Sequence, residues 1–395
     1  MFRNEDLPQG WEIKKLSELC DVRDGTHDSP KYKSEGYPLI TSKNVTNGFI
    51  DFSEVNLISK EDYDKVNKRS YVDDGDILMP MIGTIGNPII VKKEREFAIK
   101  NVALIKFTET DVSNKYIKLF LESINFKHYI KRINRGGTQK FISLRDIRNC
   151  PIVLSPLETQ KKIVEILEKA EKLKEWRAEA DGLSDNLLKS VYFNYFHGET
   201  NFKTLKEISE VITKGTTPTS LGFDYTTEGV PFIRAENILG GKINTNLIGK
   251  FIPKEANESL KRSKTKEGDV LLTIAGVIGR SSYIPSGVAE CNLNQAVSII
   301  RLKKGYNSKY VSAALESPFV QKQIKPLIKQ VAQANLNLQQ VGNLKIPINH
   351  EKEKEFLRFL KSYDNLKTHQ SKSKQEIDNL FNTLMQKAFK GELVC

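Results

Sequence analysis

The chain reads GDILMPMIGTIG over residues 75–86 and GDVLLTIAGVIG over residues 268–279. Six of the twelve positions are identical, and most of the others exchange one apolar residue for another. In each copy the Gly-Asp pair predicts a turn that leads into a buried strand. The two later glycines predict a tight turn into the next strand, where positive φ or a close backbone approach excludes a Cβ. A phosphate cradle is the alternative, but neither copy has P-loop spacing or opens a clear helix, so scaffold is favoured.

The spacing of 193 residues extends to both sides of this stretch, with small displacements. The matching segments are 16–26 (LSELCDVRDGT) with 208–216 (ISEVITKGT), 37–45 with 230–238, 101–105 (NVALI) with 294–298 (NQAVS), 115–123 with 309–317, 136–149 with 330–343, and 186–199 with 379–392. This period is well above that of solenoid repeats, so the chain is predicted to be two copies of one unit.

The composition of the 395 residues is typical of a globular protein with two or three domains. The sequence contains no run of 18 apolar residues, so no membrane-spanning helix is predicted. The N-terminal segment lacks the apolar core of a signal peptide. The four cysteines are far apart and form no CxxC pair, which argues against a zinc site or a disulfide framework. A cytoplasmic protein is therefore expected.

The formal net charge of +12 points to an acidic partner, and nucleic acid is the commonest one. Residues 201–395 carry 29 basic and 18 acidic residues, whereas residues 1–200 carry 32 and 31. Within each copy the basic residues gather late, nine against two acidic ones over 115–148 and eight against one over 301–345. A solvated surface is the alternative for either stretch alone, but their equivalent positions favour a binding role.

Each copy ends in a segment that predicts a long helix, over 157–196 and about 351–390. Two unrelated amphipathic helices are the alternative, but partners of equal length more naturally pack antiparallel, as a rod of roughly 58 Å with one domain at each end. The stripes predicted for this packing are Ile163, Ile166, Ala170, Leu173, Arg177, Ala180, Ser184, Leu187 and Val191, and Phe356, Leu360, Tyr363, Lys367, Gln370, Lys374, Ile377, Phe381, Leu384 and Ala388.

Short apolar runs such as YPLI, GDILM and VALIKF, bounded by Gly, Asn and Asp, predict short strands in each copy. The predicted fold class is therefore α+β: two duplicated α/β domains with small mixed or antiparallel sheets, joined by two long antiparallel helices in a pseudo-two-fold arrangement. The predicted boundaries are 1–156 for the first domain, 157–197 for the first helix, 198–350 for the second domain and 351–395 for the second helix.

The sequence contains no recognisable catalytic motif. An adenine methyltransferase would need an [Asp/Asn]-Pro-Pro-aromatic loop, and NPII at 87–90 has only the Asn-Pro. No glycine-rich loop is placed to hold S-adenosylmethionine, and no GxxxxGK[ST] motif predicts ATP use. The five histidines show no metal spacing. The sequence therefore favours a binding protein without catalytic or metal-ligating residues.

The sequence resembles a known family, the DNA-specificity subunit of type I restriction–modification enzymes, over essentially the whole chain. The resemblance lies in LPQGWEIKKLSEL near the N-terminus, the paired Gly-Thr segments, the two GD[I/V]L…GxIG stretches, and CPIVLSPLETQKKIVEILEKAE at the start of the first helix. The second copy departs from the family pattern, because IPINHEKEKEFLRFL lacks the Pro-Leu-Glu-x-Gln signature.

The resemblance implies two target-recognition domains, each reading one half of a bipartite double-stranded DNA target. It further implies a helical spacer that docks two methylase subunits, with restriction (motor-nuclease) subunits joining the complex. S-adenosylmethionine, ATP and Mg²⁺ would then belong to partner subunits, and this chain would be non-catalytic. If the helices set the gap between half-sites, adding one turn to both near Arg177 and Gln370 should lengthen the gap and leave the half-sites unchanged.

Candidate DNA contacts are polar residues at strand ends and in the basic stretches, because base edges are read by paired hydrogen bonds and phosphates by basic or hydroxyl side chains. In the first copy they are Lys31, Tyr32, Thr41, Ser42, Lys43, Asn44, Arg135, Thr138, Gln139, Lys140 and Arg145. In the second they are Lys214, Thr216, Arg234, Glu236, Asn237, Lys329, Gln330, Gln333, Asn335 and Asn337.

Three other functions are compatible with the sequence. A stand-alone duplicated DNA-binding protein of architectural type would bind DNA tightly without partners. An enzyme with an unfamiliar site would show turnover by itself, and a protein-interaction scaffold would lack salt-sensitive DNA affinity.

Overall fold

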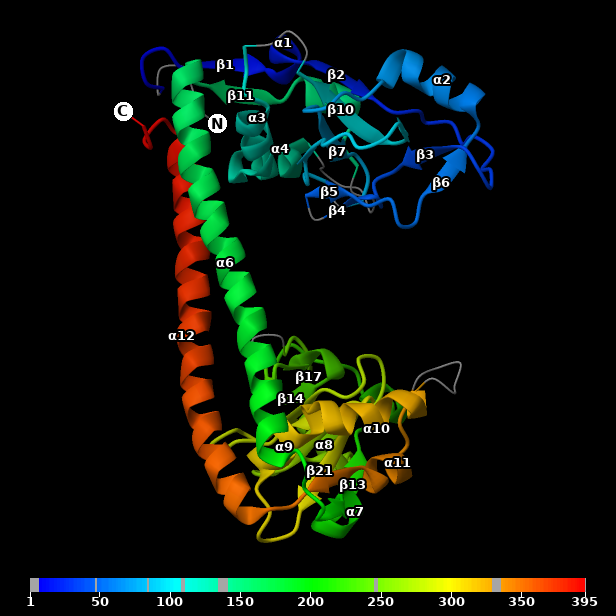
Figure 1. Ribbon diagram of the computed structural model, residues 1–395, viewed down its shortest axis with the longest axis vertical. Coiled ribbons are helices and arrows are strands. Elements are labelled where there is room, and N and C mark those ends of the chain that lie inside the picture. The colour runs from blue at the N-terminus through cyan, green and yellow to red at the C-terminus, as the bar shows by residue number, and fades with distance from the viewer. Residues whose placement is uncertain are drawn as a thin grey trace. The chain divides into compact units, whose positions relative to one another are not determined.

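The computed structural model (Figure 1) describes residues 7–46, 48–83, 85–107, 111–133, 141–244, 248–328 and 335–394. Its contacts divide the chain into two compact units. Unit 1 comprises Met1–Arg177 with Lys372–Cys395, and unit 2 comprises Ala178–Ser371. Each unit therefore holds one copy of the repeat and one part of each long helix. The domain boundaries given above, which set the helices apart from the domains, stay a prediction.

The centre of unit 1 is a four-stranded antiparallel sheet. Its strands, in spatial order, are β2 (Asp21–Asp24), β10 (Val102–Lys106), β7 (Ile77–Pro80) and β8 (Ile89–Ile90). Successive side chains of a strand point to opposite faces, so β10 sends Ala103 and Ile105 into one apolar cluster and Val102 and Leu104 into another. Both faces of the sheet are covered, and all five residues of β10 are accordingly buried.

Helices cover one face of this sheet, and smaller sheets cover the other. The helical face has α1 (Leu16–Leu19), α3 (Asn114–Glu122), α4 (Ile124–Ile133) and α5 (Leu144–Arg148), with the antiparallel pair β1 (Glu12–Lys15) and β11 (Pro151–Leu154). The other side has β3 (Tyr37–Ile40) between β6 (Asn56–Ile58) and β9 (Ala98–Ile99), the hairpin β4 (Val45–Thr46) and β5 (Phe49–Ile50), and the helix α2 (Lys60–Ser70). β3 is antiparallel to β6 and parallel to β9.

Unit 2 repeats this architecture, which confirms the predicted duplication and the α+β fold class. Its four-stranded sheet is β13 (Ser209–Lys214), β21 (Val297–Leu302), β18 (Val270–Thr273) and β19 (Ser281–Tyr283). A smaller sheet contains β17 (Phe251–Ile252), β14 (Val230–Ile233) and β20 (Asn292–Leu293) in that spatial order. Two further sheets are strand pairs: β12 (Phe202–Thr204) pairs with β22 (Lys345–Pro347), and β15 (Ile238–Leu239) pairs with β16 (Lys242–Ile243). The helices are α7 (Leu205–Ile208), α8 (Lys254–Ser259), α9 (Ser308–Glu316), α10 (Pro318–Ile328) and α11 (Leu338–Asn343).

The repeated Gly-Asp pair forms the turn before β7 and before β18. The glycine has positive φ in both copies, +84° in the first and +80° in the second, a region that glycine adopts without steric cost. The aspartate turns inward: Asp76 lies 3.0 Å from Lys106 Nζ, and Asp269 lies 2.7 Å from Arg301. Both carboxylates are buried. The Gly-Asp pair therefore has a structural role in both copies, in which the glycine forms the turn and the aspartate forms a buried ion pair.

The structure corrects two details of the sequence comparison. Val102 and Val297 occupy the same place, because they pair with Pro80 and Thr273, which are 193 residues apart. The match of NVALI with NQAVS was therefore wrong by two residues, since unit 2 carries extra residues before β21. Likewise α1 corresponds to α7, so LSEL matches LKEI rather than ISEV, and a bulge in β13 absorbs the added residue. Similar apolar patterns in the neighbouring residues concealed both insertions from the sequence.

The two long helices lie side by side within each unit and run antiparallel, as predicted (Figure 1). They are α6 (Leu157–Phe196) and α12 (His350–Ala388). In unit 2, Gln370 Nε2 donates to Ser184 Oγ at 2.7 Å, and one residue further along α6 Asp185 accepts from the Tyr363 hydroxyl at 3.1 Å. In unit 1 the ends of the helices share one apolar cluster that includes Leu167.

Most residues of the two predicted stripes are buried or half-buried, but three are exposed. Leu173 and Leu187 are 38% and 46% exposed, and Lys374 is also exposed. A straight helix has 3.6 residues per turn and drifts by about 20° per heptad against a strict seven-residue repeat. The covered face of α6 therefore passes through Lys174 and Leu188 instead, which are half-buried.

Candidate nucleic-acid interface

Three chain connections emerge together from one end of the four-stranded sheet in each unit. In unit 1 the first residues of β10 pair with the last residues of its two antiparallel neighbours, Ala103 with Asp24 and Val102 with Pro80. The residues that follow β2 and β7 therefore lie beside those that precede β10. We call this place the loop edge. It is defined by residues 25–27, 81–83 and 99–101 in unit 1 and by 215–217, 274–276 and 293–296 in unit 2.

In each unit a glycine allows the connection after the first strand of the sheet (β2 or β13) to lie against the residues that precede the central strand (β10 or β21). In unit 1, Thr26 N donates to the Ile99 carbonyl oxygen at 3.0 Å, and a Cβ on Gly25 would collide with that oxygen. In unit 2 the same bond joins Thr216 N to the Leu293 carbonyl oxygen at 3.2 Å, and the preceding glycine is equally confined. The paired Gly-Thr segments of the sequence are thus a backbone requirement of both loop edges.

The loops after β3 and β14 join the loop edge through matching backbone hydrogen bonds. Lys100 N donates to the Ile40 carbonyl oxygen at 2.8 Å, and Asn294 N donates to that of Ile233 at 3.0 Å. These loops contain seven of the predicted DNA contacts. Thr41, Ser42 and Arg234 are half-buried, Lys43 and Glu236 are exposed, and Asn44 and Asn237 are buried.

The two buried asparagines hold these loops in shape. The Asn44 side-chain oxygen accepts from the N–H of Thr41 at 3.0 Å and from its hydroxyl at 2.9 Å, and the Asn44 amine donates to the backbone carbonyls of Asp51 and Glu54. Asn237 is fully buried, and its side-chain oxygen accepts from Arg234 N at 2.8 Å. Their side chains are used inside the loop, so neighbouring residues are better placed to reach a ligand.

In unit 1 a histidine connects the loop edge to a buried carboxylate. His27 Nδ1 lies 2.9 Å from Asn101 Oδ1, and His27 Nε2 lies 2.9 Å from Asp24 Oδ2. These hydrogen bonds, first to Asn101 and then to Asp24, raise the pKa of His27 above 6.5. The reason is that both ring nitrogens face oxygen acceptors, and only the imidazolium can donate to both.

Arg69, at the C-terminal end of α2, forms an ion pair with the other oxygen of Asp24. The side chains of His27 and Arg69 are 60% and 65% exposed, whereas that of Asp24 is 5% exposed. A buried anion therefore orients two outward-facing cationic groups, an arrangement suited to the acceptor atoms of a base edge or to a phosphate.

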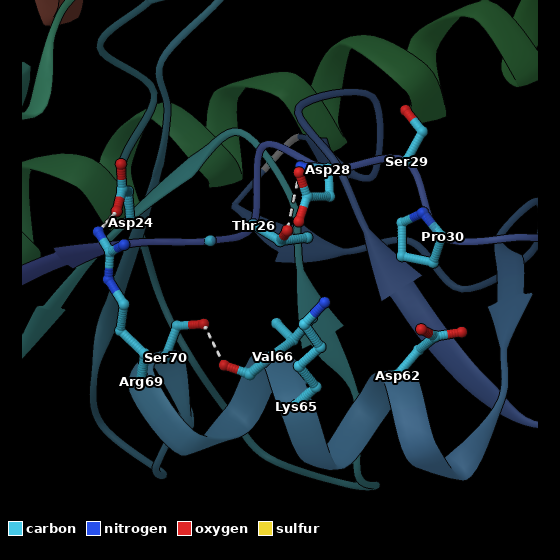
Figure 2. A pocket seen from close by; sticks show the side chains of 11 residues that line it. Asp24, Thr26, Asp28, Ser29, Pro30, Asp62, Lys65, Val66, Arg69 and Ser70 are labelled. Carbon is cyan, nitrogen blue, oxygen red and sulfur yellow. Dashed lines mark hydrogen bonds and ion pairs between the residues drawn. The ribbon is translucent and has the colours of Figure 1, made fainter.

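Asp24 and Arg69 border an open pocket of about 340 Å³ between the loop that follows β2 and the helix α2 (Figure 2). In Figure 2 the loop contributes Thr26 and Asp28 to one wall, and α2 contributes Asp62 and Lys65 to the other. Asp24 and Arg69 close one end. Carboxylates and cations both line the pocket, so it fits a ligand with donors and acceptors better than a bare anion.

Unit 2 carries different side chains on the same backbone arrangement. At the place of the histidine–asparagine contact, Thr217 Oγ1 donates to Gln295 Oε1. Lys214 stands where unit 1 has Asp24. Asp24 pairs with the second residue of β10, and Lys214 pairs with the second residue of β21. The arginine of α2 has its sequence counterpart in Arg262, which is exposed. A cation thus replaces the buried carboxylate in unit 2.

The remaining predicted residues are more scattered. Asn335 forms an isolated bridge to Ala275 at the loop edge of unit 2, and Asn337 caps α11 by accepting from Gln340 N at 2.8 Å. Lys214 and Thr216 lie at the loop edge or directly before it and are half-buried. Exposed residues away from the loop edge as defined here are Lys31, Tyr32 and Arg145. Outside the described residues lie Arg135, Thr138, Gln139, Lys140, Lys329, Gln330 and Gln333.

Sequence reasoning missed four residues that the fold brings to this place, namely His27, Arg69, Asn101 and Gln295, and it also missed Arg262, the sequence counterpart of Arg69. A signal existed for the two arginines, because KRS recurs at 68–70 and 261–263 with the spacing of the repeat. No such signal existed for Asn101 and Gln295, since the insertion before β21 placed them out of register.

No group of three or more His, Cys, Asp or Glu side chains that could hold a metal ion occurs among the described residues. Burial raises the pKa of the Cys20 thiol to about 12 and that of Cys291 to about 11, and it raises the pKa of Cys150 as well. These thiols are therefore poor nucleophiles at neutral pH. Within the part of the chain that is described, no helix combines the length and apolar character needed to span a membrane.

A family model described as the type I restriction modification DNA specificity domain matches the chain twice, over residues 8–179 and 198–379. The EcoBI specificity subunit of Escherichia coli, a type I restriction enzyme subunit, is 29% identical over 174 residues. That match spans 42% of this chain and 36% of the relative, about a third of its length. The putative MjaX specificity subunit of Methanocaldococcus jannaschii is 21% identical over 98% of this chain and 95% of that one.

A solved chain of a type I R-M system, from work on the assembly and conformational transition of that complex, covers 100% of both chains. Its TM-score is 0.62 at 17% sequence identity, so the likeness establishes the fold.

Proposed function

We propose that this chain, which belongs to the type I restriction modification DNA specificity family, reads a bipartite DNA target with its two loop edges, one half-site each. The observation that carries the proposal is the pairing of one backbone arrangement with two sets of side chains. Base edges are read by side chains that form paired hydrogen bonds, and each loop edge offers amide and basic groups of this kind. Two domains that differ there would select different half-sites.

Affinity for DNA would come mainly from phosphate contacts, which carry little sequence information. The net charge of +12 supports this, as do the basic stretches that include exposed Lys127 and Lys131 in unit 1 and exposed Lys322 and Lys325 in unit 2. DNA binding by the assembled complex should therefore weaken steeply as salt is raised.

Methyl transfer, ATP use and cleavage would belong to partner subunits: two methylases docked on the long helices, and restriction subunits that join through the complex. S-adenosylmethionine, ATP and Mg²⁺ would bind in those partners, and the complex would act on DNA in the cytoplasm. Exposed apolar side chains on the helices suit a docking surface. Trp176 is 56% exposed, Leu183 is 62% exposed and Leu380 is 46% exposed.

The first test is a methylome. This chain is co-expressed with a candidate methylase subunit from the same genome in a host that lacks adenine methylation, and modified adenines are then sequenced. Two short half-sites around a fixed gap are the expected result. A soluble complex that leaves no new methylation would contradict the proposal and favour a stand-alone DNA-binding protein, whose affinity a salt titration would measure.

A second test addresses the helices as a ruler. One helical turn is inserted into both α6 and α12, near Arg177 and Gln370. The methylated motif should keep both half-sites while its nonspecific gap becomes longer. An unchanged gap would show that the helices do not set the spacing.

A further inference from the structure

We propose that Asn101 in unit 1 and Gln295 in unit 2 are specificity-determining residues, each reading one adenine of its half-site, and that His27 and Thr217 position them. This inference rests on the proposed function and names the groups by which each loop edge would select a base. Asn and Gln side chains pair with N6 and N7 of adenine in the major groove, which few other side chains can do.

Asn101 and Gln295 follow the same backbone landmarks in the two units. Each amide follows the short strand that runs parallel to β3 or β14, and each precedes the central strand of the four-stranded sheet. The residue two before Asn101 is Ile99 and the residue two before Gln295 is Leu293, and both accept the hydrogen bond of the Gly-Thr segment. Counted from β9 and β20, the two amides therefore sit at equivalent places, and Ala296 is one extra residue between Gln295 and β21.

A neighbouring side chain orients each amide. His27 Nδ1 lies 2.9 Å from Asn101 Oδ1 in unit 1, and Thr217 Oγ1 donates to Gln295 Oε1 in unit 2. Because a donor faces the amide oxygen, the amine is directed away from it. The oxygen keeps a second lone pair for the adenine N6 amine, while the amide amine is available for N7. A side chain ordered before DNA arrives also loses less entropy on binding.

Each positioning residue is itself held by its surroundings. His27 is held by the buried carboxylate of Asp24 through its other ring nitrogen at 2.9 Å. Thr217 follows the confined Gly-Thr segment and is half-buried. The two units thus reach the same amide orientation with different donors, an imidazole in one and a hydroxyl in the other.

The backbone decides which substitution isolates the amide. Among the described residues, Asn101 is the only non-glycine residue with positive φ, at 54°, a conformation that Asn and Asp tolerate better than most residues. Asn101→Asp therefore keeps the shape and the backbone preference while turning the outward donor into an acceptor. Gln295→Glu makes the same chemical change in unit 2, where the residue is exposed.

The experiment measures methylation of duplexes by the purified complex with its methylase, with each half-site position varied in turn. Asn101→Asp should lower the preference for adenine at one position of the unit 1 half-site by roughly 10- to 100-fold, the range expected for one bidentate base contact. The unit 2 half-site should be read as before. Gln295→Glu should give the mirror result, and Asn101→Gly, which keeps the positive φ, should reproduce the loss.

The matched control is Asn149→Asp, because Asn149 is exposed at the end of α5, next to β11 and outside the loop edge. It should leave both half-sites unchanged. Wild-type preferences in the variants of Asn101 and Gln295, or an equal loss on every duplex, would overturn the inference. A wild-type complex that methylates no split motif would instead refute the proposed function, so the two failures are distinguishable.

His27 needs a separate test, because it would act through Asn101. His27→Leu should lose preference at the same base pair as Asn101→Asp, whereas His27→Gln, which keeps an N–H donor, should restore much of it. An equal effect of both variants, or a loss without base dependence, would show that His27 has only a structural role.

Discussion

The loop edges of the two units differ in what has been kept since the chain was duplicated and what has changed. Both confine a glycine against a backbone carbonyl, and both close the neighbouring loop with a buried asparagine, Asn44 or Asn237. The neighbouring polar side chains differ: buried Asp24 with exposed His27 in unit 1, and half-buried Lys214 with half-buried Thr217 in unit 2. The backbone and asparagine contacts fix the shape of the loop edge, while these side chains are able to diverge without changing it.

The largest expected effect breaks the shared backbone arrangement itself. Gly215→Ala and Gly25→Ala each place a Cβ against backbone atoms that cannot rotate away. We expect a loss of at least about 4 kcal/mol in the free energy of unfolding, or failure to fold, since the clash displaces strand ends. Thermal and denaturant unfolding of the purified chain measure it.

Gly182→Ala is the matched control, because Gly182 lies within α6 and a Cβ there meets no atom within 4 Å. Alanine favours a helix over glycine by about 1 kcal/mol, so the melting temperature should rise slightly. If one of the loop-edge glycines tolerated alanine and the other did not, the two edges would not share one backbone arrangement.

Much of the fold could be predicted from the sequence, because the same patterns occur in both copies of the repeat. The Gly-Asp turns, the apolar strands and the long helices depend on local patterns that survive in both copies. The predicted stripes failed at Leu173 and Leu187, where a seven-residue repeat departs from the true helical period. Strand register was also misjudged before β21, since an insertion between similar apolar patterns leaves no local trace.

The candidate site was less predictable than the fold. Strand ends pointed to the loops after β3 and β14, yet Asn44 and Asn237 are turned inward, because an amide can close a loop as readily as it can read a base. His27 and Asn101 are 74 residues apart and meet only through the pairing of β2 with β10. A contact made by tertiary pairing carries no signature in either segment alone.

The second prediction compares the buried ion pairs of the Gly-Asp turns. Asp269→Ala removes the carboxylate that pairs with Arg301, and Asp76→Ala removes one of the two carboxylates that pair with Lys106. Asp269→Ala should cost about 3 kcal/mol of stability, because the partly buried Arg301 loses its counter-charge. Asp76→Ala should cost less, because Asp73 still lies 2.7 Å from Lys106 Nζ. Chemical denaturation measures both, and Glu12→Ala, which breaks the exposed pair with Lys14, is the control with an expected change below about 1 kcal/mol. A change as small as the control would show that these pairs do not hold the turns.

The third prediction compares the two halves of the helix pair. In unit 2, Gln370→Ala removes the amide that bonds to buried Ser184, and we expect a loss of about 1 kcal/mol. In unit 1, Asp378→Ala breaks a half-exposed ion pair with Lys174 that spans 3.6 Å, and the expected change is within about 0.5 kcal/mol. Denaturant midpoints of the two variants should differ accordingly. Equal midpoints would mean that the polar centre of the helix pair contributes no more than its surface.

The smallest expected effect depends on pH and distinguishes the two positioning residues. The pKa of His27 is raised above 6.5 by its hydrogen bonds to Asn101 and Asp24 and by the charge of Asp24, which outweigh desolvation and the opposing charge of Arg69. The imidazolium contribution is therefore fully present below pH 6.5 and is lost as the pH rises through the raised value. Adenine preference at the unit 1 half-site should therefore fall by about a few-fold as the pH is raised from below 6.5 through the raised pKa of His27.

Thr217 does not titrate in this range, so preference at the unit 2 half-site should stay constant in the same complex and the same reaction. Both preferences are measured at each pH by competition between duplexes that differ in a single half-site. The unit 2 half-site serves as the internal standard. His27→Gln should abolish the pH dependence of unit 1 while keeping its preferred base. A parallel decline of both half-sites would place the pH sensitivity in the methylase or the DNA and leave His27 without this role.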